Sequence, residues 1–360
     1  MTDLTRSERL VESLKRIQTR AESPRMEDET FKGLKINWPK GLAPKPSASL
    51  PEVDVIAMMD TSAEAEAMCD VFTPGYYYDT RWYRYAKNFA AYEPLLGPDS
   101  AAGPKAPYLG LYFVTTVGKL KVLVYKTNLH LHIDGKKMPN GQYSTPIVKM
   151  LAQMIGDARP KLFLTTGTSG GVYCSMQLGD VTVTRAAHFL CQDHYKNAPF
   201  NGKTYRSDWD VPKSYAAEAQ KLMHGYAGQL SNKGEPKEPC NCNPSKNYPT
   251  KIWFDGVAPI APFHPVLTTD FFDFGTSTNH LDHDGMAVEM DDACLGLVCS
   301  QMKKPPLWAS VRNLSDPCIN GKLDKDDQKS CANFYYSKYG YWTTVMSGIT
   351  TWSIIAGFKP

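Results

Sequence analysis

The chain has 360 residues, of which 42% are hydrophobic and 21% are charged, as expected for an ordinary soluble globular enzyme. Its net charge of +3 is spread along the chain without a basic stripe, which argues against nucleic-acid binding. No run approaches the roughly 18 consecutive apolar residues of a membrane span. The N-terminus lacks the apolar core and small-residue cleavage site of a secretory signal, so we expect a cytoplasmic protein that contacts no membrane.

The beginning of the chain is expected to form an arm. An apolar stripe at helical spacing predicts a helix over residues 10–17, and a Pro-rich stretch over residues 39–51 is typical of a linker. We therefore expect an N-terminal arm and linker over residues 1–50, packed on the body or on a partner subunit. Residues 51–360 would then form one catalytic domain, with an insertion at about residues 196–250.

The body of the chain alternates between strand and helix patterns. A buried strand over residues 53–59 is followed by a helix over residues 63–72, with Ser62 as its N-cap. Further strands are expected at 109–116, 120–126, 181–184, 257–260, 266–269, 286–289 and 308–312, and further helices at 146–155, 215–228, 292–302 and 341–355. This alternation predicts an α/β fold, a three-layer α/β/α sandwich with a mixed central sheet.

The segment LFLTTGTSGGV, residues 162–172, places glycines and hydroxyl side chains directly after the apolar residues of another expected strand. We expect a turn at residues 167–171, because glycine allows positive φ or a close approach of backbone to a ligand. The spacing of these glycines is not that of a dinucleotide-binding loop, and no nucleophile-elbow motif surrounds Ser169.

Nine cysteines, an odd and scattered set, predict reduced and buried thiols, notably Cys174, Cys191, Cys294 and Cys299. Cys240 and Cys242 are spaced too closely for a usual zinc site and lie in a Lys/Pro/Asn-rich loop, which favours a flexible insertion. The histidine pairs at 130/132 and 280/283 could offer metal ligands, but we expect no metal and no cofactor.

Four motifs in fixed order resemble a known enzyme superfamily. They are TGTSGG with LGDVTVTR (166–171 and 178–185), TTDFF (268–272), AVEMDDA (287–293) and VRNLSD (311–316). The order is similar to that of the nucleoside phosphorylase/nucleosidase superfamily, above all its methylthioadenosine/S-adenosylhomocysteine nucleosidase branch. The resemblance implies a phosphorylase/hydrolase-like fold and cleavage of a purine nucleoside, with water or phosphate as co-substrate. It also implies a homodimer or a higher homo-oligomer.

The resemblance covers residues 53–357 and assigns the chemistry to particular side chains. Cleavage of a purine N-glycosidic bond leaves negative charge on the base, so a general acid must protonate it. The superfamily's acid is the Asp of a Ser-Asp pair, here Ser315 and Asp316. From the residues alone, this Ser-Asp-Pro sequence could also be a turn or a helix N-cap.

Sugar and base contacts follow from the same resemblance. Met290 and Asp291 match a Met-Glu pair that binds the sugar, with Glu289 near base and sugar. Aspartate is one methylene shorter, which withdraws its carboxylate by about 1.5 Å. Either the backbone, a water or Asp292 compensates, or the sugar is not an ordinary ribose. Alternatively, these acids only complement a helix dipole.

The purine is expected to stack on Phe272, whereas Phe271 is expected in the core. The glycines and hydroxyls of the TGTSGG segment would form the floor under the purine and sugar. The substrate contacts expected there are Thr166, Gly167, Thr168 and Gly170.

The choice between water and phosphate depends on the first strand. Residues 53–68 contain neither the glycine nor the arginine with which phosphorylases hold phosphate. Glu64 matches the glutamate that activates water in nucleosidases, with Glu66 as the alternative, although both could be exposed helix acids. Arg312 matches an arginine that organises the water and the sugar hydroxyls, and it could still bind phosphate. The sequence thus predicts a purine nucleosidase acting on an adenosine-type nucleoside. A phosphorylase or a catalytically altered nucleoside-binding protein remains the alternative.

Overall fold

The computed structural model describes residues 26, 31–36, 43–244 and 250–360. The helix expected over residues 10–17 lies outside this part of the chain. No helix among the described residues is both long enough and apolar enough to cross a membrane.

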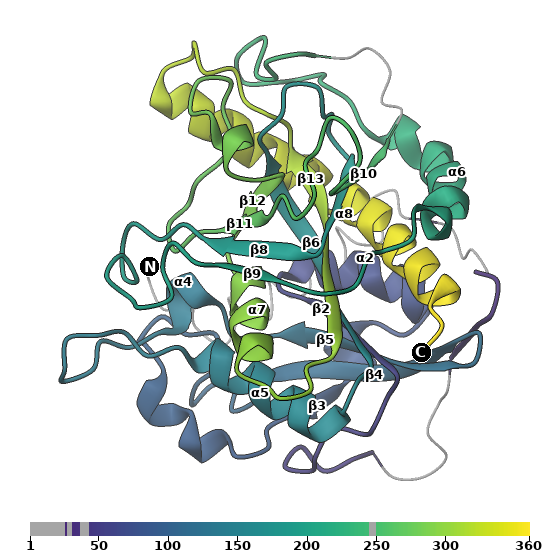
Figure 1. Cartoon of the computed structure of the whole chain (residues 1–360), viewed down its shortest axis with the longest axis vertical. Helices are drawn as coiled ribbons and strands as arrows, with labels where there is room; N and C mark the ends of the chain where they lie inside the picture. Colours follow the sequence, from purple (N-terminus) through teal and green to yellow (C-terminus); the bar gives the residue numbers. More distant parts are fainter. Residues whose placement is uncertain (1–25, 27–30, 37–42, 245–249) are drawn as a thin grey trace, which may run out of the picture.

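A mixed sheet forms the centre of the molecule, with the path β1-β4-β5-β2-β6-β12-β11-β8-β9 (Figure 1). Strand β13 pairs with β6 and β7, β10 pairs with β7, and β3 pairs with β4. The strands are β1 (Leu34–Ile36), β2 (Val55–Met59), β3 (Tyr83–Tyr85), β4 (Gly110–Val117), β5 (Leu120–Thr127), β6 (Leu162–Gly171), β7 (Val181–Thr184), β8 (Ala186–Phe189), β9 (Thr204–Arg206), β10 (Ile252–Phe254), β11 (Val266–Thr268), β12 (Ala287–Glu289) and β13 (Leu307–Asp316).

Helices cover the sheet in two groups. Those of the described part are α2 (Ser62–Phe72), α3 (Tyr78–Arg81), α4 (Leu131–Asp134), α5 (Pro146–Ala158), α6 (Ala217–Tyr226), α7 (Asp292–Ser300) and α8 (Lys325–Gly357), with single 3₁₀ turns at Phe89–Ala91, Glu93–Leu95, Lys213–Ala216, Ala227–Gln229 and Leu281–His283. Helices α2, α6 and α8 pack together on one apolar cluster, and α5 and α7 pack on a second. The predicted three-layer α/β fold is confirmed.

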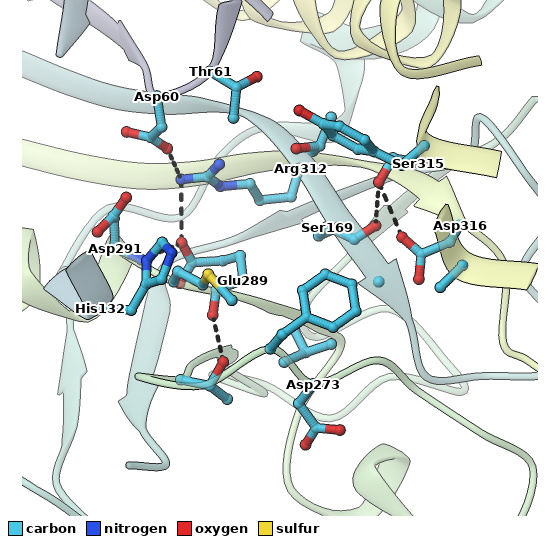
Figure 2. Close-up of a pocket in the computed structure, with 18 of the residues that line it drawn as sticks. Asp60, Thr61, His132, Ser169, Asp273, Glu289, Asp291, Arg312, Ser315 and Asp316 are labelled. Carbon is cyan, nitrogen blue, oxygen red and sulfur yellow. Dashed lines mark hydrogen bonds and ion pairs between the residues drawn. The ribbon is translucent and has the colours of Figure 1, made fainter. Parts of the chain in front are cut away.

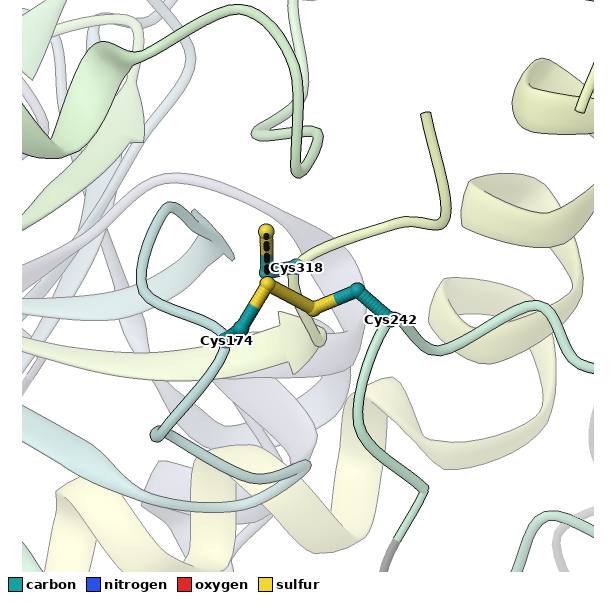
Figure 3. Close-up of side chains that lie close together, drawn as sticks. All are labelled: Cys174, Cys242 and Cys318. Atoms are coloured by element: carbon teal, nitrogen blue, oxygen red, sulfur yellow. Dashed lines mark hydrogen bonds between the residues drawn. A yellow bond between two sulfur atoms is a disulfide. The ribbon is translucent and has the colours of Figure 1, made fainter. Parts of the chain in front are cut away.

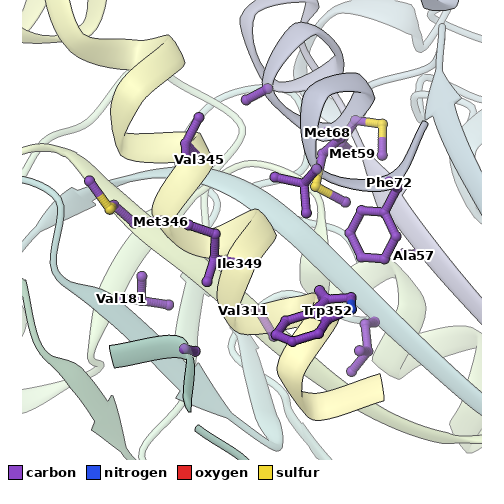
Figure 4. Packing of buried hydrophobic residues seen from close by; sticks show 14 of the residues in the cluster. Ala57, Met59, Met68, Phe72, Val181, Val311, Val345, Met346, Ile349 and Trp352 are labelled. Carbon is purple, nitrogen blue, oxygen red and sulfur yellow. The ribbon is translucent and has the colours of Figure 1, made fainter. Parts of the chain in front are cut away.

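The larger core cluster lies between α2, α8 and the sheet. Trp352 and Ile349 of α8, Phe72 and Met68 of α2, and Val311 of β13 are all buried in it (Figure 4). Burial of such apolar side chains is the main favourable term in folding. This core fixes α2 and α8 relative to the strand ends that form the site.

Most predicted elements are confirmed, but three differ for identifiable reasons. The N-cap of α2 is Thr61 rather than Ser62, because Thr61 and Glu64 form a reciprocal capping box. The glycine-rich segment expected to be a turn continues β6, because β13 pairs with β6 as far as Gly170. The strand expected at 257–260 is irregular, and residues 252–254 pair with β7 instead.

The body begins before the boundary expected at residue 50. Strand β1 pairs antiparallel with β4, and the Phe31 ring lies 4.7 Å from the Trp352 ring. The backbone N–H of Met26 donates to the hydroxyl of Tyr341 at 3.0 Å. Part of the expected arm is therefore built into the sheet and the core.

The expected insertion contains regular structure and is joined to other segments by two disulfides. Strand β9 extends the sheet, and α6 packs on α8. One disulfide joins Cys174 to Cys242 (Figure 3), and the other joins Cys240 to Cys331. The expectation of reduced thiols was wrong for these four residues, because their partners lie 68 and 91 positions away along the chain. The thiol of Cys318 remains free, 3.6 Å from the Cys174 sulfur.

We expect loss of the Cys240–Cys331 disulfide to lower the free energy of unfolding by about 2–4 kcal/mol, because the cross-link restricts the unfolded chain. The measurement is urea unfolding of Cys331→Ser without reductant. Cys299→Ser is the matched control, because Cys299 is a buried free thiol. Alkylation of all nine cysteines in the unreduced, denatured protein would contradict the pairing.

Candidate active site

One cavity of about 350 Å³ opens where the carboxyl ends of β2, β6 and β13 meet. In open α/β sheets this edge is where ligands bind. All of the predicted site residues except Thr166 and Gly167 line the cavity, and further lining residues are Asp60, Thr61, His130, His132, Ile133, Ser169, Thr269, Asp273, Val288, Ala332, Asn333 and Tyr336 (Figure 2). Residues of TGTSGG, TTDFF, AVEMDDA and VRNLSD thus meet at one cavity, whereas none of the LGDVTVTR residues lines it.

Asp316 is the last residue of β13, and its carboxyl group is almost completely buried. The hydroxyl of Ser315 donates to Asp316 Oδ1 at 3.0 Å and is also 3.3 Å from the carbonyl of Ser169 (Figure 2). Burial raises the pKa of Asp316 to about 7, although the Ser315 hydrogen bond opposes this. The carboxyl group can therefore hold a proton near neutral pH, as a general acid must.

The glycines of β6 are needed for close packing rather than for a turn. A Cβ on Gly170 would lie 3.1 Å from Asp316 Oδ2 and 2.9 Å from a methyl group of Val288. A Cβ on Gly167 would lie only 2.5 Å from Glu64 Oε1. Gly170 thus lets the acid approach the strand, and Gly167 makes room for the Glu64 carboxylate.

Two predicted substrate contacts do not reach the cavity. Thr166 is buried, and its hydroxyl pairs with the hydroxyl of Thr351 on α8 at 2.8 Å. Gly167 is covered by Glu64. Neither residue lines the cavity, so their predicted contacts with the substrate gain no support from its geometry and stay predictions.

Glu64 is buried, which excludes the alternative of an exposed helix acid. One of its oxygens accepts from the backbone N–H groups of Asp60 and Thr61, at 2.8 and 2.7 Å. The other accepts from the backbone N–H and the hydroxyl of Thr168, at 2.7 and 2.6 Å. About four acceptor positions are available on an ionised carboxylate, and all are occupied here. Glu66 is half-buried and does not line the cavity.

Arg312 is enclosed by three carboxylates. Its Nε donates to Asp292 at 2.9 Å, and its Nη2 lies 3.0 Å from Asp60 Oδ2 and 3.3 Å from Glu289 Oε2 (Figure 2). Nη2 also contacts the second oxygen of Asp292. These contacts use Nε and Nη2 and surround the guanidinium with negative charge, whereas Nη1 makes none of them.

Asp60 has one oxygen without a partner. Oδ2 is bound to Arg312, whereas Oδ1 is buried and has no hydrogen-bond partner among the described residues. Burial raises the pKa of Asp60 to about 7, although the Arg312 charge opposes this. A buried polar atom of this kind normally requires a ligand or a water. Asp60 was missed in the sequence, although it directly follows β2 at the ligand-binding edge of the sheet.

Both carboxylate oxygens of Asp291 are bound by the neighbouring segment at residues 130–131. Its Oδ1 accepts from the backbone N–H of Leu131 at 2.8 Å, and its Oδ2 lies 3.0 Å from Nδ1 of His130. Asp292, the other candidate for a sugar contact, is bound to Arg312 and does not line the cavity. The surroundings of Asp291 therefore differ from what the Met-Glu pattern of the resemblance implies.

Aromatic and apolar side chains surround the mouth of the cavity. Phe272 is 57% exposed, and Tyr336 of α8 and Ile133 of α4 are also exposed. The Phe272 ring is free to cover a planar base that enters from solvent. Phe271 is only half-buried and belongs to neither large core cluster, so its expected core position was wrong.

Three groups of described residues bring possible metal ligands within 4.8 Å of one another. In the cavity group, Asp60, His130 and Asp291, one oxygen of Asp60 is bound to Arg312 and Nδ1 of His130 contacts Asp291, whereas Oδ1 of Asp60 has no hydrogen-bond partner among the described residues. A second group is the cysteine cluster of Figure 3, and the third lies on the surface at His280, Asp282 and His283. The absence of a metal and of a cofactor stays a prediction.

No family model matches the sequence, and no curated protein matches it. Among solved structures, the 5′-methylthioadenosine/S-adenosylhomocysteine nucleosidase of Neisseria meningitidis in complex with methylthio-immucillin-A is 12% identical, with a TM-score of 0.48 over 85% of this chain and 100% of that chain. The Helicobacter pylori enzyme of the same name is 13% identical, with a TM-score of 0.48 over 85% and 99%. Futalosine hydrolase of Helicobacter pylori is 12% identical, with a TM-score of 0.46 over 85% and 99%.

Proposed function

We propose that the protein is a nucleosidase that hydrolyses the N-glycosidic bond of a purine nucleoside, with an adenosine-type base. The observation that carries the proposal is Asp316, a buried carboxyl group with a pKa near 7 that lines the same cavity as a carboxylate cluster. The motif order that resembles nucleosidases supports the choice of a purine. The exposed Phe272 ring at the mouth provides a stacking surface for it.

The proposed reaction uses the two kinds of carboxyl group differently. Asp316 transfers its proton to the purine as the bond between sugar carbon and base nitrogen breaks. The positive charge that develops on the sugar is stabilised by those carboxyl groups around Arg312 that are ionised. Glu289 is not counted among them, because burial raises its pKa well above the usual value. A water then forms the new bond to the sugar carbon and gives its proton to Asp60.

The water is assigned to Asp60 because Oδ1 of Asp60 has no hydrogen-bond partner in the described part of the chain, whereas the acceptor positions of Glu64 are filled. Glu64, predicted to direct the nucleophile, would instead hold the backbone of Asp60 and the side chain of Thr168 in place. Glu64 thereby positions the water through its neighbours rather than by direct contact.

Water is favoured over phosphate by the charges of the cavity. Arg312 is the one arginine among the described lining residues, no lysine joins it, and its hydrogen bonds go to carboxylates. Carboxyl groups of Asp60, Glu64, Asp273, Glu289, Asp291 and Asp316 line the same cavity. These carboxyl groups outnumber the two cations that line the cavity, Arg312 and His130, so those that are ionised disfavour a phosphate dianion, because like charges in a poorly solvated site interact strongly.

We expect base release from adenosine or 5′-methylthioadenosine at the same rate with and without inorganic phosphate, with free sugar as the second product. The measurement is chromatography of the released base and sugar in phosphate-free buffer, followed by titration with phosphate. Strict dependence on phosphate, or formation of a sugar 1-phosphate, would replace hydrolysis by phosphorolysis. Binding of nucleosides without release of base would leave only a binding protein.

A further inference from the structure

The contact between Asp291 and His130 changes what the sugar side of the cavity presents to a ligand. Both oxygens of Asp291 already accept hydrogen bonds, from the Leu131 backbone and from the His130 ring. The Asp291 side chain is only 2% exposed, whereas the His130 side chain is 17% exposed. Both residues line the cavity, and the imidazole is the more exposed of the two.

The second ring nitrogen of His130 is available to a ligand. Nδ1 faces Asp291, and Nε2 has no hydrogen-bond partner among the described residues, nor is it enclosed as a buried orphan atom. His130 lines the cavity together with Asp60 and Met290. A histidine whose Nδ1–H is held by a carboxylate directs its other nitrogen in a fixed direction.

We propose that His130 is a specificity-determining residue that donates a hydrogen bond from Nε2 to an oxygen on the sugar of the bound nucleoside. This inference rests on the proposed nucleosidase function and names the group that meets the sugar where the Met-Glu pattern would place a carboxylate. Asp291 then acts as a positioning residue, because it orients the His130 ring and does not itself reach the sugar.

The charges around His130 keep it a donor. Asp291 at the start of α7, Asp60 after β2 and Asp134 of α4 face it, and His132 is the other ionisable ring beside it. Burial alone would lower the pKa of His130, but the hydrogen bond and the charge of Asp291 outweigh it and raise the pKa to about 9. The ring is a cation at neutral pH, with N–H groups on both nitrogens.

A donor and a carboxylate select different sugars. A carboxylate accepts, so it needs a hydroxyl hydrogen on the ligand, and an O-methyl group in place of that hydroxyl abolishes the bond. A cationic donor needs only an acceptor oxygen and keeps the bond to a small O-methyl ether. The site should therefore bind a deoxy sugar, which lacks the contacted oxygen, more weakly than it binds the O-methyl ether at the same position.

The test combines substitutions of His130 with substrates that lack one sugar oxygen, in the manner of a double-mutant cycle. Adenosine and its 2′-, 3′- and 5′-deoxy analogues are assayed for kcat and KM with the wild type, His130→Phe and His130→Gln. In the wild type, removal of the contacted oxygen is expected to raise KM about tenfold, as for a hydrogen bond to a charged group. In His130→Phe the same removal should change KM less than twofold, and His130→Gln should recover part of the difference because its amide still donates. Equal effects of every deoxy analogue on all three enzymes would overturn the role of His130.

Two further readouts separate this role from a structural one. The contribution of a protonated His130 is present below its raised pKa and is lost as the pH rises through about 9, so KM should rise there in the wild type and not in His130→Phe. The 2′-, 3′- or 5′-O-methyl ether at the contacted position should bind better than the deoxy analogue. His188→Gln, on β8 and outside the cavity, is the control.

The analogues are also titrated against the Asp316→Asn variant at equilibrium, so that affinity is read without turnover. If the wild type releases no base from any nucleoside, the proposed function fails, and with it this inference. If base is released but no sugar oxygen is coupled to His130, the inference alone fails. Both results are therefore informative and distinguishable.

Discussion

Replacement of Asp316 by asparagine is expected to lower kcat for base release by about 10²–10⁴-fold, the usual contribution of a general acid. The asparagine amide keeps the size of the side chain and can still accept from the Ser315 hydroxyl, so nucleoside binding should change little. It cannot supply a proton to the leaving purine. The measurement is steady-state release of base, combined with equilibrium titration of the nucleoside.

The pH profile provides an independent check on the same residue. The pKa of Asp316 is raised to about 7, so the proton is present below that pH and is lost above it. Activity of the wild type that depends on this acid should therefore decline as the pH rises past 7, and Asp316→Asn should lack that limb. Asp326→Asn, exposed at the start of α8, is the matched control and should keep the wild-type rate. A variant at position 316 that stays within twofold of the wild type would remove Asp316 from the mechanism.

The parts of the site found in the sequence are those whose signal is local. Glu289, Met290 and Asp316 were predicted from short motifs that resemble those of the nucleosidase superfamily, and each motif spans only a few neighbouring residues at or near the end of a strand. The capping box of Thr61 and Glu64 was equally visible as a T-x-x-E pattern before a helix, although Ser62 was chosen instead.

The parts that were missed depend on long-range contacts. Asp60 and Arg312 are 252 residues apart, and His130 and Asp291 are 161 residues apart, so no local pattern pairs them. The composition of TGTSGG is typical of a turn, yet continuous pairing with β13 makes it a strand. The disulfides of Cys240 and Cys242 were not predicted for the same reason, because the cysteines with which they pair lie in distant segments.

Replacement of Arg312 by leucine is expected to destabilise the fold by about 3–5 kcal/mol, the cost of leaving a buried ion pair without one partner. The guanidinium is the cation shared by Asp60, Glu289 and Asp292, and its side chain is only 2% exposed. Leucine removes that charge and leaves three carboxyl groups together in a buried place. The measurement is urea unfolding at pH 7, monitored by circular dichroism.

Further comparisons determine whether the loss of stability in Arg312→Leu comes from the unpaired carboxylates. The Arg312→Leu deficit should shrink as the pH falls, because unpaired buried carboxylates take up protons and become neutral. Adding Asp292→Asn to Arg312→Leu should recover part of the stability, since it removes one of the uncompensated charges. Arg312→Lys should be intermediate, because an ammonium group keeps the charge but cannot bind Asp292 with two parallel hydrogen bonds. If Arg312→Leu unfolded at the wild-type urea concentration, or if its deficit were independent of pH, these carboxyl groups would already be neutral in the folded protein. The charge stabilisation proposed for the developing sugar cation would then have no source in this cluster.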